Sequence, residues 1–203
     1  YYRGGGVLAT PVTYSVIMVK RIDGIETILQ EPIYFKVVAM YDGTLERKSY
    51  EAMDAFRVAA TNFQQDLMAD NVSLSKSKAK VNAMKRAYDK ASLSSPDILK
   101  ELNNTRLQLR TLEKELKGNP VKAEIGERSN PTASDGNSLG WRALGNTYGP
   151  TEEHQALLKR VKSQLNKVKL KLQVIIDISL PELERRLKKI GSPWIEGQGL
   201  LKN

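Results

Sequence analysis

Apolar residues recur every three or four positions along the chain after Glu46, which is the spacing of a helix that buries one face. We expect the first helix to bury Met53, Phe56, Ala60, Phe63, Leu67, Leu74, Val81, Met84, Tyr88 and Ala91. The pattern is sustained long enough to predict a coiled coil. Polar Asp70 and Ser77 interrupt it on either side of Asn71, so we expect the helix to bend, fray or break there.

A second, shorter helix is expected between two proline-containing turns. Ser95-Pro96-Asp97 opens it, and Gly118-Asn119-Pro120 ends it in the usual order of a terminal glycine and a following proline. Its apolar face is predicted to contain Ile98, Leu102, Thr105, Leu109, Leu112 and Leu116.

The third helix is expected to begin at Pro150 or Thr151. Its predicted buried positions are Leu158, Val161, Leu165, Val168, Leu172 and Ile175. Pro181 predicts a kink, because proline removes one backbone hydrogen bond of a helix. Ser179 and Glu182 have the spacing of a capping box, so we expect a new helix to start there. This last helix continues the apolar face through Leu183, Leu187 and Ile190.

The lengths of these helices suggest how they pack. Helices one and three are each on the order of 60 Å long, and helix two is about half that length. The simplest packing pairs the two long helices as an antiparallel hairpin, with helix two filling one end. The connection from Gly118 to Pro150 is long for a compact domain. Because it carries Trp141 and Tyr148, we expect it to fold back over the bundle.

The first 43 residues alternate with a period of two instead, which predicts strands. One strand is expected within 12–21, and Asp23-Gly24 suits a two-residue type I′ turn. Two more strands follow at 25–29 and 33–40, separated by Pro32. Three antiparallel strands of this kind resemble the last part of an Ig-like β-sandwich. They bury little surface and leave open edges, so partner strands or the helices have to cover them.

The predicted fold class is therefore α+β and mainly α. A short antiparallel β segment, an Ig-like remnant, precedes a long antiparallel helical hairpin or three-helix coiled coil. We divide the chain into a β segment (1–43), a helical module with a long loop at 118–150 (44–192) and a C-terminal tail (193–203). The sequence begins without methionine or a recognisable signal peptide, and we expect it to be a piece of a longer protein.

Composition excludes several kinds of chemistry. The 203 residues include no cysteine, which removes disulfides, thiolate zinc sites and cysteine nucleophiles. No apolar run is long enough to predict a transmembrane segment. The net charge of +9 admits nucleic acid or an anionic surface as a partner.

The excess positive charge lies on the predicted helices. It is concentrated at Lys76, Lys78, Lys80, Lys85, Arg86, Lys159, Arg160, Lys162, Lys167, Lys169 and Lys171. The last three alternate with apolar residues and so spread around their helix, and no aromatic residues stand among them to stack on bases. This arrangement favours the solvated flanks of a coiled coil over a surface that binds phosphates.

Three short motifs contain residue types used in catalysis or binding, but none is predicted to act. His154 follows two glutamates, and neighbouring residues of a helix do not face each other, so we expect a partly buried helix-start residue. Arg3-Gly4-Gly5-Gly6 precedes no helix and so cannot be a phosphate-binding loop. Ser134-Asp135-Gly136 lacks the spacing of an aspartate box. The sequence thus predicts no catalytic, cofactor-binding or metal-ligating residue, and no cofactor.

Five stretches stand in an order typical of one protein family: PVTYSVIMV, FKVVAMYDG, GNPVKAEIGERSNPT, YGPTEEHQALLKRV and LPELERRLKKIGSPWIEG. Most of the chain resembles the C-terminal region of bacterial proteins built on a sortilin-like (VPS10-type) BNR-repeat propeller, often labelled glycosyl hydrolases. In that family an Ig-like module and a helical hairpin follow the propeller. The resemblance implies an upstream propeller as partner and a periplasmic, cell-surface or secreted location. It carries over no catalytic residue.

The functional interpretation that follows is a non-catalytic structural or interaction module of an exported propeller protein. Its partners would be the propeller of the same parent chain, a second copy or another protein. One alternative is an accessory part of a glycosyl hydrolase with a sialidase-like propeller, where it shapes the active cleft. A lesser alternative, which the spread of charge argues against, is a binder of nucleic acid or an anionic surface.

Overall fold

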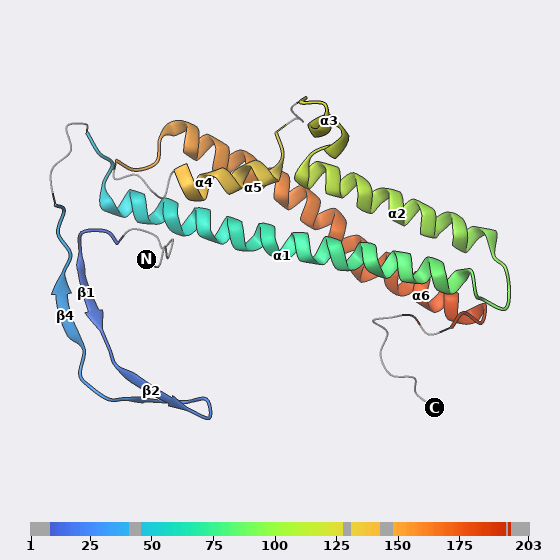
Figure 1. Ribbon diagram of the computed structural model, residues 1–203, viewed down its shortest axis with the longest axis horizontal. Helices are drawn as coiled ribbons and strands as arrows, with labels where there is room; N and C mark the ends of the chain where they lie inside the picture. Colours follow the sequence, from blue (N-terminus) through green and yellow to red (C-terminus); the bar gives the residue numbers. More distant parts are fainter. Residues whose placement is uncertain (1–8, 41–45, 128–130, 143–147, 194, 196–203) are drawn as a thin grey trace.

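The computed structural model describes residues 9–40, 46–127, 131–142, 148–193 and 195, with the backbone alone at 140–142. Long helices form an elongated bundle, and a narrow β structure projects from one end of it (Figure 1). The predicted class, mainly helical with a short antiparallel β segment at the N-terminus, is confirmed. Arg3-Gly4-Gly5-Gly6 and most of the predicted tail lie outside the described residues.

The β structure is one bent two-stranded ribbon, which we call the β arm (residues 9–40). Its strands are β1 (Thr13–Val16), β2 (Val19–Ile22), β3 (Ile25–Ile28) and β4 (Ile33–Lys36). β1 pairs with β4, and β2 pairs with β3, both antiparallel. The expectation of three strands side by side is therefore wrong. The predicted first strand divides near Ile17, and its two halves pair with different parts of the returning chain.

The tight turn of the β arm is confirmed in its geometry. Asp23 and Gly24 both have positive φ, of 50° and 83°, and Ile22 pairs with Ile25 across them. Positive φ at both central positions is what a type I′ turn requires, and Asp-Gly tolerates it better than most pairs. The backbone N–H of Leu29 also donates to the carbonyl of Met18 at 2.9 Å, so the pairing continues beyond the β2–β3 ladder.

The helical part contains three major rods and a short-helix connection. The rods are α1 (Tyr50–Tyr88), α2 (Pro96–Lys117) and the joined pair α5 (Glu152–Val174) and α6 (Leu180–Lys189). Between α2 and α5 lie α3 (Pro120–Glu124), the 3-10 turn η1 (Ala133–Gly136) and α4 (Asn137–Arg142). The π-helical turn η2 (Ile175–Ser179) connects α5 to α6.

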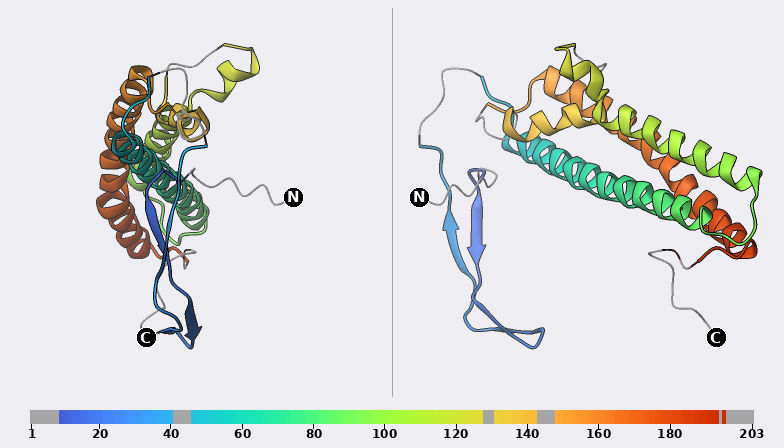
Figure 2. Two further views of the ribbon diagram at one scale, coloured as in Figure 1. Left: turned by 90° about the vertical axis from the view of Figure 1, so that its left-hand side faces the viewer. Right: turned by 45° about the vertical axis from the view of Figure 1, so that its right-hand side comes forward.

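The relative direction of the two long rods differs from the expectation. Lys169 pairs with Asp66 at 3.9 Å, and Glu184 pairs with Lys80 at 2.8 Å, so position numbers rise together along both rods. The rods α1 and α5–α6 are therefore parallel, as Figure 1 shows. The antiparallel member is α2, whose Glu115 pairs with Lys171 of α5. As expected, α2 fills one end, beside the C-terminal half of α1 and beside α6 (Figures 1 and 2).

The long connection after α2 makes the parallel arrangement possible. It carries the chain back along the first half of α1, so that α5 starts where α1 starts. The backbone N–H of Lys48 donates to the carbonyl of Tyr148 at 2.9 Å at that end. At the other end, the N–H of Leu93 donates to the carbonyl of Ile190 at 3.2 Å. The two long rods therefore start at the same end of the bundle, and not at opposite ends as the expected antiparallel hairpin requires.

The expectation that the connection folds over the bundle is confirmed for η1 and α4, whereas α3 buries no residue. η1 contacts both α1 and α5, and Ala133 and Leu139 are buried in the core. Gly136 faces the ring of Phe63 and the side chain of Val161 so closely that no Cβ fits between them. The Trp141 side chain, which the sequence suggested as an anchor, lies outside the described residues.

One continuous hydrophobic core runs between the rods. Every apolar position predicted for α2 and α5 is buried, and so are those of α1 except Tyr88 and Ala91, which are half-buried. In the last helix Leu183 and Leu187 are buried and Ile190 is half-buried. The sequence pattern missed Leu180 and Ile195, which also join the core.

Helix α1 does not break near Asn71, contrary to one of the expected outcomes. The Asn71 side-chain amide donates to the carbonyl of Leu67 at 2.9 Å, and the Ser77 hydroxyl donates to the carbonyl of Ser73 at 2.8 Å. Both polar side chains thus bond back to their own helix, which lets α1 continue through its polar positions.

The expected capping box at Ser179 is wrong. Ser179 has helical backbone angles and makes no side-chain cap bond, while Glu182 pairs with Arg185 instead. The chain passes Pro181 through η2, where the N–H of Leu180 donates to the carbonyl of Ile175, five residues earlier. A π turn takes up the irregularity that proline introduces, so the rod continues without a new start.

Candidate functional site

The β arm carries an apolar face that is largely exposed in the described structure. In an antiparallel pair, residues directly opposite share a face, and faces alternate along each strand. The cross-strand partners of β1 and β4, with the bond from Val37 N–H to the Val12 carbonyl, therefore put six apolar side chains on one side. We call this side the arm face: Val12, Tyr14, Val16, Ile33, Phe35 and Val37.

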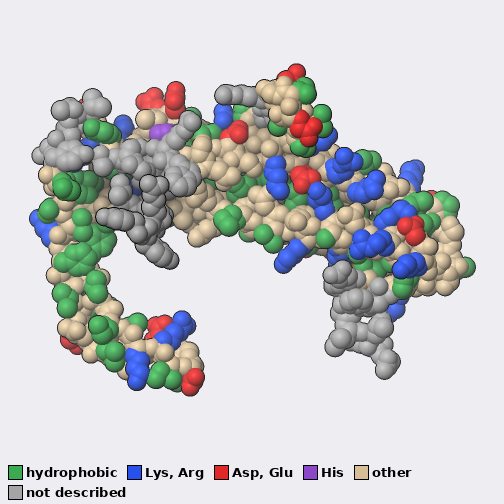
Figure 3. Space-filling view, viewed as in Figure 1, with side chains coloured by type: hydrophobic (Ala, Val, Ile, Leu, Met, Phe, Trp, Pro, Cys, Tyr) green, Lys and Arg blue, Asp and Glu red, His purple; other side chains and the backbone are tan. Residues whose placement is uncertain are grey.

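The arm face is organised around an aromatic pair. The rings of Tyr14 and Phe35 stack with their centroids 5.9 Å apart. Val16 and Ile33 extend the face toward the bend, and both are more than half exposed. In the space-filling view hydrophobic side chains follow the arm along its length (Figure 3). Exposed apolar surface arranged as one contiguous patch marks an interaction site more often than scattered exposed residues do.

The opposite side of the same ladder is more polar. It presents Thr13, Ser15, Tyr34 and Lys36, which are all exposed. This side therefore suits solvent, whereas the arm face suits burial. The contrast is what one sheet of a β-sandwich shows when its partner sheet is absent.

A polar network attaches the β arm to the start of α1. The hydroxyl of Thr10 donates to Asp54 Oδ2 at 2.7 Å, and Asp54 Oδ1 accepts from Arg57 at 3.3 Å. Thr10 and Arg57 are both buried, and the Tyr14 hydroxyl lies 3.3 Å from Thr10 Oγ1. Hydrogen bonds to charged groups are stronger than neutral ones, so this network positions the root of the arm on the bundle.

His154 serves the start of α5. The Thr151 hydroxyl accepts from the backbone N–H of His154 at 3.2 Å, and the imidazole Nδ1 accepts from the backbone N–H of Thr151 at 3.3 Å. These two bonds form a capping box in which histidine takes the position of the usual glutamate. The half-buried helix-start residue expected from the sequence is what the structure shows.

We expect Thr151→Ala to lower the free energy of unfolding by about 1 kcal/mol, because it removes the cap of α5. Urea denaturation followed by circular dichroism measures this change. Thr111→Ala is the matched control, since Thr111 is exposed within α2 and alanine is the better helix former there. Equal destabilisation by both substitutions would show that the cap is not the cause.

The rejected aspartate box has a structural explanation. Asp135 accepts from the backbone N–H of Thr132 at 2.7 Å and closes a small capping box around η1. Gly136 is required by the close contact with Phe63. In the described part of the chain no group of three or more His, Asp or Glu side chains is placed to hold a metal ion.

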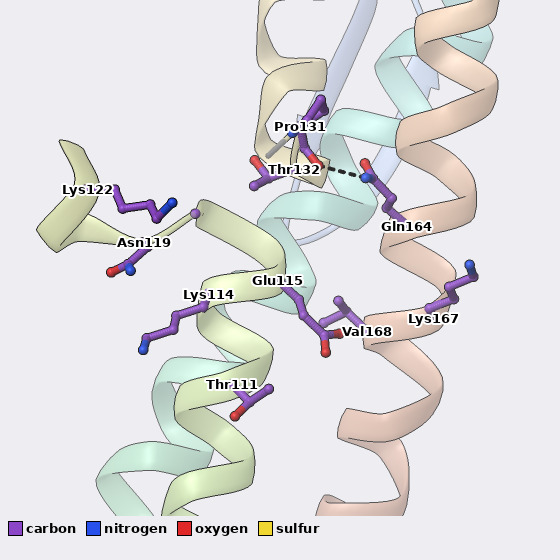
Figure 4. A pocket seen from close by; sticks show the side chains of 11 residues that line it. Thr111, Lys114, Glu115, Asn119, Lys122, Pro131, Thr132, Gln164, Lys167 and Val168 are labelled. Atoms are coloured by element: carbon purple, nitrogen blue, oxygen red, sulfur yellow. Dashed lines mark hydrogen bonds between the residues drawn. The ribbon is translucent and has the colours of Figure 1, made fainter. Parts of the chain in front are cut away.

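A groove separates α2 from α5 and has two hollows. The first, of about 420 Å³, lies where α2 ends and Pro131 crosses toward α5. Figure 4 shows Glu115 and Val168 facing each other across it, while Lys114 and Lys167 point away on opposite sides. Gln164 donates to the carbonyl of Pro131 at 2.7 Å and closes one end. Because the lysines diverge, this hollow does not form a site for a small anion.

The second hollow, of about 690 Å³, continues the groove toward the π turn. The ion pair between Glu115 and Lys171, at 3.0 Å, stands between the two hollows. The second hollow is lined largely by apolar groups, among them Leu107, Val174 and Ile175. Leu107 and Val174 are both more than half exposed, which is unusual for apolar residues at facing positions of two packed helices.

Basic side chains gather on the half of the bundle away from the arm (Figure 3). No acidic residue lies between Asn71 and Tyr88 of α1. Several of these cations nevertheless pair with carboxylates of another helix: Lys78 with Glu113, Lys80 with Glu184 and Arg186 with Glu101. These ion pairs connect neighbouring helices, which the sequence analysis did not predict.

Comparison with known proteins leaves the family open. No family model, curated protein or solved structure matches this chain. Among the helices that the structure describes, none combines the length and apolar character needed to cross a membrane. The arm face is the most distinctive surface of the described structure.

Proposed function

We propose that this chain is a non-catalytic docking module that holds a β-rich module of its parent protein through the arm face. The helical bundle acts as a rigid base for the β arm. The observation that carries the proposal is the contiguous apolar side of β1 and β4, exposed to solvent and opposed by a polar side.

The energetics of a two-stranded ribbon support this proposal. An isolated hairpin is at best marginally stable in water, and three or more strands or a packed layer are needed for independent stability. The β1–β4 pair has no third strand beside it in the described structure. The arm therefore gains most from an occupant that supplies both apolar cover and strand edges.

A β-sheet fits these requirements better than a helix does. A sheet can pack its own apolar side on the arm face at about 10 Å, as in a sandwich, and can extend the ladder at either edge. The resemblance to exported proteins with a sortilin-like BNR-repeat propeller and an Ig-like module supports the same occupant. In this proposal the β arm completes an Ig-like module that joins the propeller to the bundle.

Thiol labelling of the full-length protein tests the proposal at two neighbouring positions. Ile33→Cys lies on the arm face and Tyr34→Cys on the opposite side, and both native residues are exposed in this chain, by 56% and 71%. We expect the thiol at 33 to react about tenfold more slowly in the full-length protein than in the isolated chain. The thiol at 34 should react equally fast in both, and mass spectrometry of the labelled peptide measures each rate.

Backbone hydrogen exchange identifies the kind of occupant. A β-sheet partner is expected to slow exchange of arm amides in the full-length protein, because strand edges become hydrogen-bonded. Protection of the thiol at 33 without any slowing of amide exchange would contradict a β-sheet occupant. Equal labelling of Ile33→Cys in both proteins would overturn the docking proposal altogether.

The two alternative functions predict different experimental results for the same protein. If the arm shapes the cleft of a glycosyl hydrolase, deleting residues 12–37 lowers kcat on chromogenic glycosides while the propeller stays folded. If the chain is a docking module, the deletion lowers the stability of the propeller. The activity of the fraction that stays folded is then unchanged. Binding of the intact chain to a DNA duplex that weakens steeply with salt would support the anionic-surface alternative.

A further inference from the structure

Another hollow, of about 410 Å³, lies between α1 and α2, on the half of the bundle away from the β arm. α2 packs there beside the C-terminal half of α1 (Figure 1). Every residue that lines the hollow except Leu109 has a charged or polar side chain. Leu109 is fully buried and contributes apolar surface on the inner side. The lining therefore suits a charged ligand, in contrast to that of the apolar hollow beside Val174.

Antiparallel packing brings cations of both helices to this hollow. Lys78 of α1 pairs with Glu113 of α2 at 2.5 Å. Because the two helices run in opposite directions, Asn82, one turn further along α1, lies opposite the stretch one turn back along α2. That stretch carries Arg106 and Arg110, which stand four residues apart and so share one face of the helix. Side chains that are distant in the sequence thus line one hollow.

The charges around this hollow are not balanced. Lys78 and Glu113 compensate each other, and each side chain is about one-third exposed. Arg106 and Arg110 are both exposed, and in the described part of the chain neither pairs with a carboxylate. Three cations against one carboxylate leave the lining with a net charge of +2.

The polar groups that remain available are mainly hydrogen-bond donors. A guanidinium offers five N–H donors in a planar fork and accepts no hydrogen bond. The Asn82 amide adds donors, while the carboxylate of Glu113 is already engaged by Lys78. Such forks bind phosphate and carboxylate oxygens through paired hydrogen bonds. The net charge of the lining matches a phosphate monoester, which carries about −1.5 to −2 near neutral pH, better than it matches one carboxylate.

We propose that this hollow binds a phosphoryl group, as free phosphate or as a phosphate monoester. Arg106 and Arg110 are its main ligands, and Asn82 is an additional donor. The site takes one phosphoryl group, whereas nucleic acid requires a row of cations that follows the backbone. The hollow is separate from the arm face, so either proposal can fail while the other stands.

Titration of the intact chain with sodium phosphate at constant ionic strength gives the first test. Nuclear magnetic resonance follows the side-chain N–H signals of Arg106, Arg110 and Asn82, which report on the proposed contacts directly. These signals are expected to shift saturably with a Kd on the order of 1 mM, because the guanidinium groups are exposed to solvent. Sodium chloride at the same ionic strength should produce no saturable shift.

Substitution of the two arginines gives the second test, read from the Asn82 amide signal. Arg106→Gln with Arg110→Gln removes both forks and should weaken phosphate binding at least about tenfold. The matched control is Arg160→Gln with Lys162→Gln, which removes the same charge from exposed positions of α5 outside the hollow. The control should bind phosphate within about twofold of the wild type, because distant exposed charges are screened.

A lysine variant separates the fork from the charge. Arg106→Lys with Arg110→Lys keeps both positive charges but loses the planar forks, so its affinity for phosphate should lie between those of the wild type and the glutamine variant. Circular dichroism confirms that each variant is folded. An affinity equal to that of the wild type would contradict recognition by the guanidinium groups.

Two further probes distinguish the sources of the phosphoryl group. Glycerol 3-phosphate represents a soluble monoester, and vesicles of phosphatidic acid in phosphatidylcholine represent a lipid headgroup. A lipid source predicts that the intact chain sediments with these vesicles and that Arg106→Gln with Arg110→Gln abolishes this binding. A soluble source predicts saturable shifts with glycerol 3-phosphate and no sedimentation with vesicles. Either result supports the site.

The remaining outcomes overturn the proposal. Signals of the three side chains that do not respond to about 20 mM phosphate exclude a site of the expected affinity. Equal responses to phosphate and chloride, or an unchanged affinity in the double glutamine variant, would show that the arginines form no specific site. Equal losses in the glutamine variant and the α5 control would mean that overall charge alone attracts phosphate.

Discussion

Gly136→Ala is expected to lower the free energy of unfolding by about 1–3 kcal/mol, although it adds a single methyl group. The new Cβ would overlap Phe63 Cε1 and lie 2.7 Å from Phe63 Cζ and 3.0 Å from Val161 Cγ2. Phe63 is buried in the densely packed core, so its ring has little room to move aside. Chemical denaturation measured on both proteins gives the difference.

A double-substitution cycle separates this contact from other effects of losing a glycine. Phe63→Leu removes the ring atoms that the new methyl group meets. The cost of Gly136→Ala should therefore be clearly smaller in the Phe63→Leu background than in the wild type, with a coupling energy of about 1 kcal/mol. An unchanged cost would mean that η1 moves away from α1 and that the close packing of the connection is not essential.

Asp70→Leu is expected to raise the free energy of unfolding at neutral pH by about 1–3 kcal/mol. Asp70 lies in the buried row of α1 with 7% of its surface exposed, and in the described part of the chain nothing hydrogen-bonds its Oδ2. Burial raises the pKa of this carboxyl above its usual value; Lys169 opposes the shift, and Asp66 adds to it. A titratable carboxyl group thus occupies a position where the heptad pattern expects an apolar side chain.

The pH dependence follows from the direction of that shift. Between the usual pKa of an aspartate and the raised pKa of Asp70, the folded chain keeps a proton that the unfolded chain has lost. This residue's contribution to stability therefore falls as pH rises through that window and stays low above it. The gain from Asp70→Leu should grow over the same window and then become constant.

Asp66→Leu is the control for general effects of removing an acid from α1. Asp66 is exposed and lies 3.9 Å from Lys169, so its ion pair contributes little. We expect a change within about 0.5 kcal/mol and no comparable pH window. If Asp70→Leu proved destabilising at neutral pH, the carboxylate would have a role in the folded state that burial alone does not explain.

Much of the helical core could be predicted because periodicity reports burial directly. Every position assigned to the α2 face, from Ile98 to Leu116, is buried, and Thr105 is buried among them with its hydroxyl bonded to its own helix. The Asp23-Gly24 turn was equally predictable, since its backbone angles restrict the choice of residues. Local rules suffice where the cause of a structure lies within one turn of the chain.

The candidate surfaces were less accessible to such reasoning. The arm face depends on which residue of β1 stands opposite which residue of β4, and alternation alone predicted three strands instead of a bent pair. The sequence analysis also did not predict that Leu170 and Val174 of α5 would be exposed. Their exposure became visible only when the positions of α1 and α2 were known.

The sequence by itself determined which face of each helix is buried, where α2 and α5 start, and where the ribbon turns. Tertiary structure alone decided that α1 and α5 run in the same direction, that η1 presses Gly136 against Phe63, and that the arm face stays largely exposed. The physical reason is that hydrophobic periodicity indicates which side chains of a helix or strand become buried. Periodicity does not indicate which distant segment covers those side chains, or in which direction that segment runs.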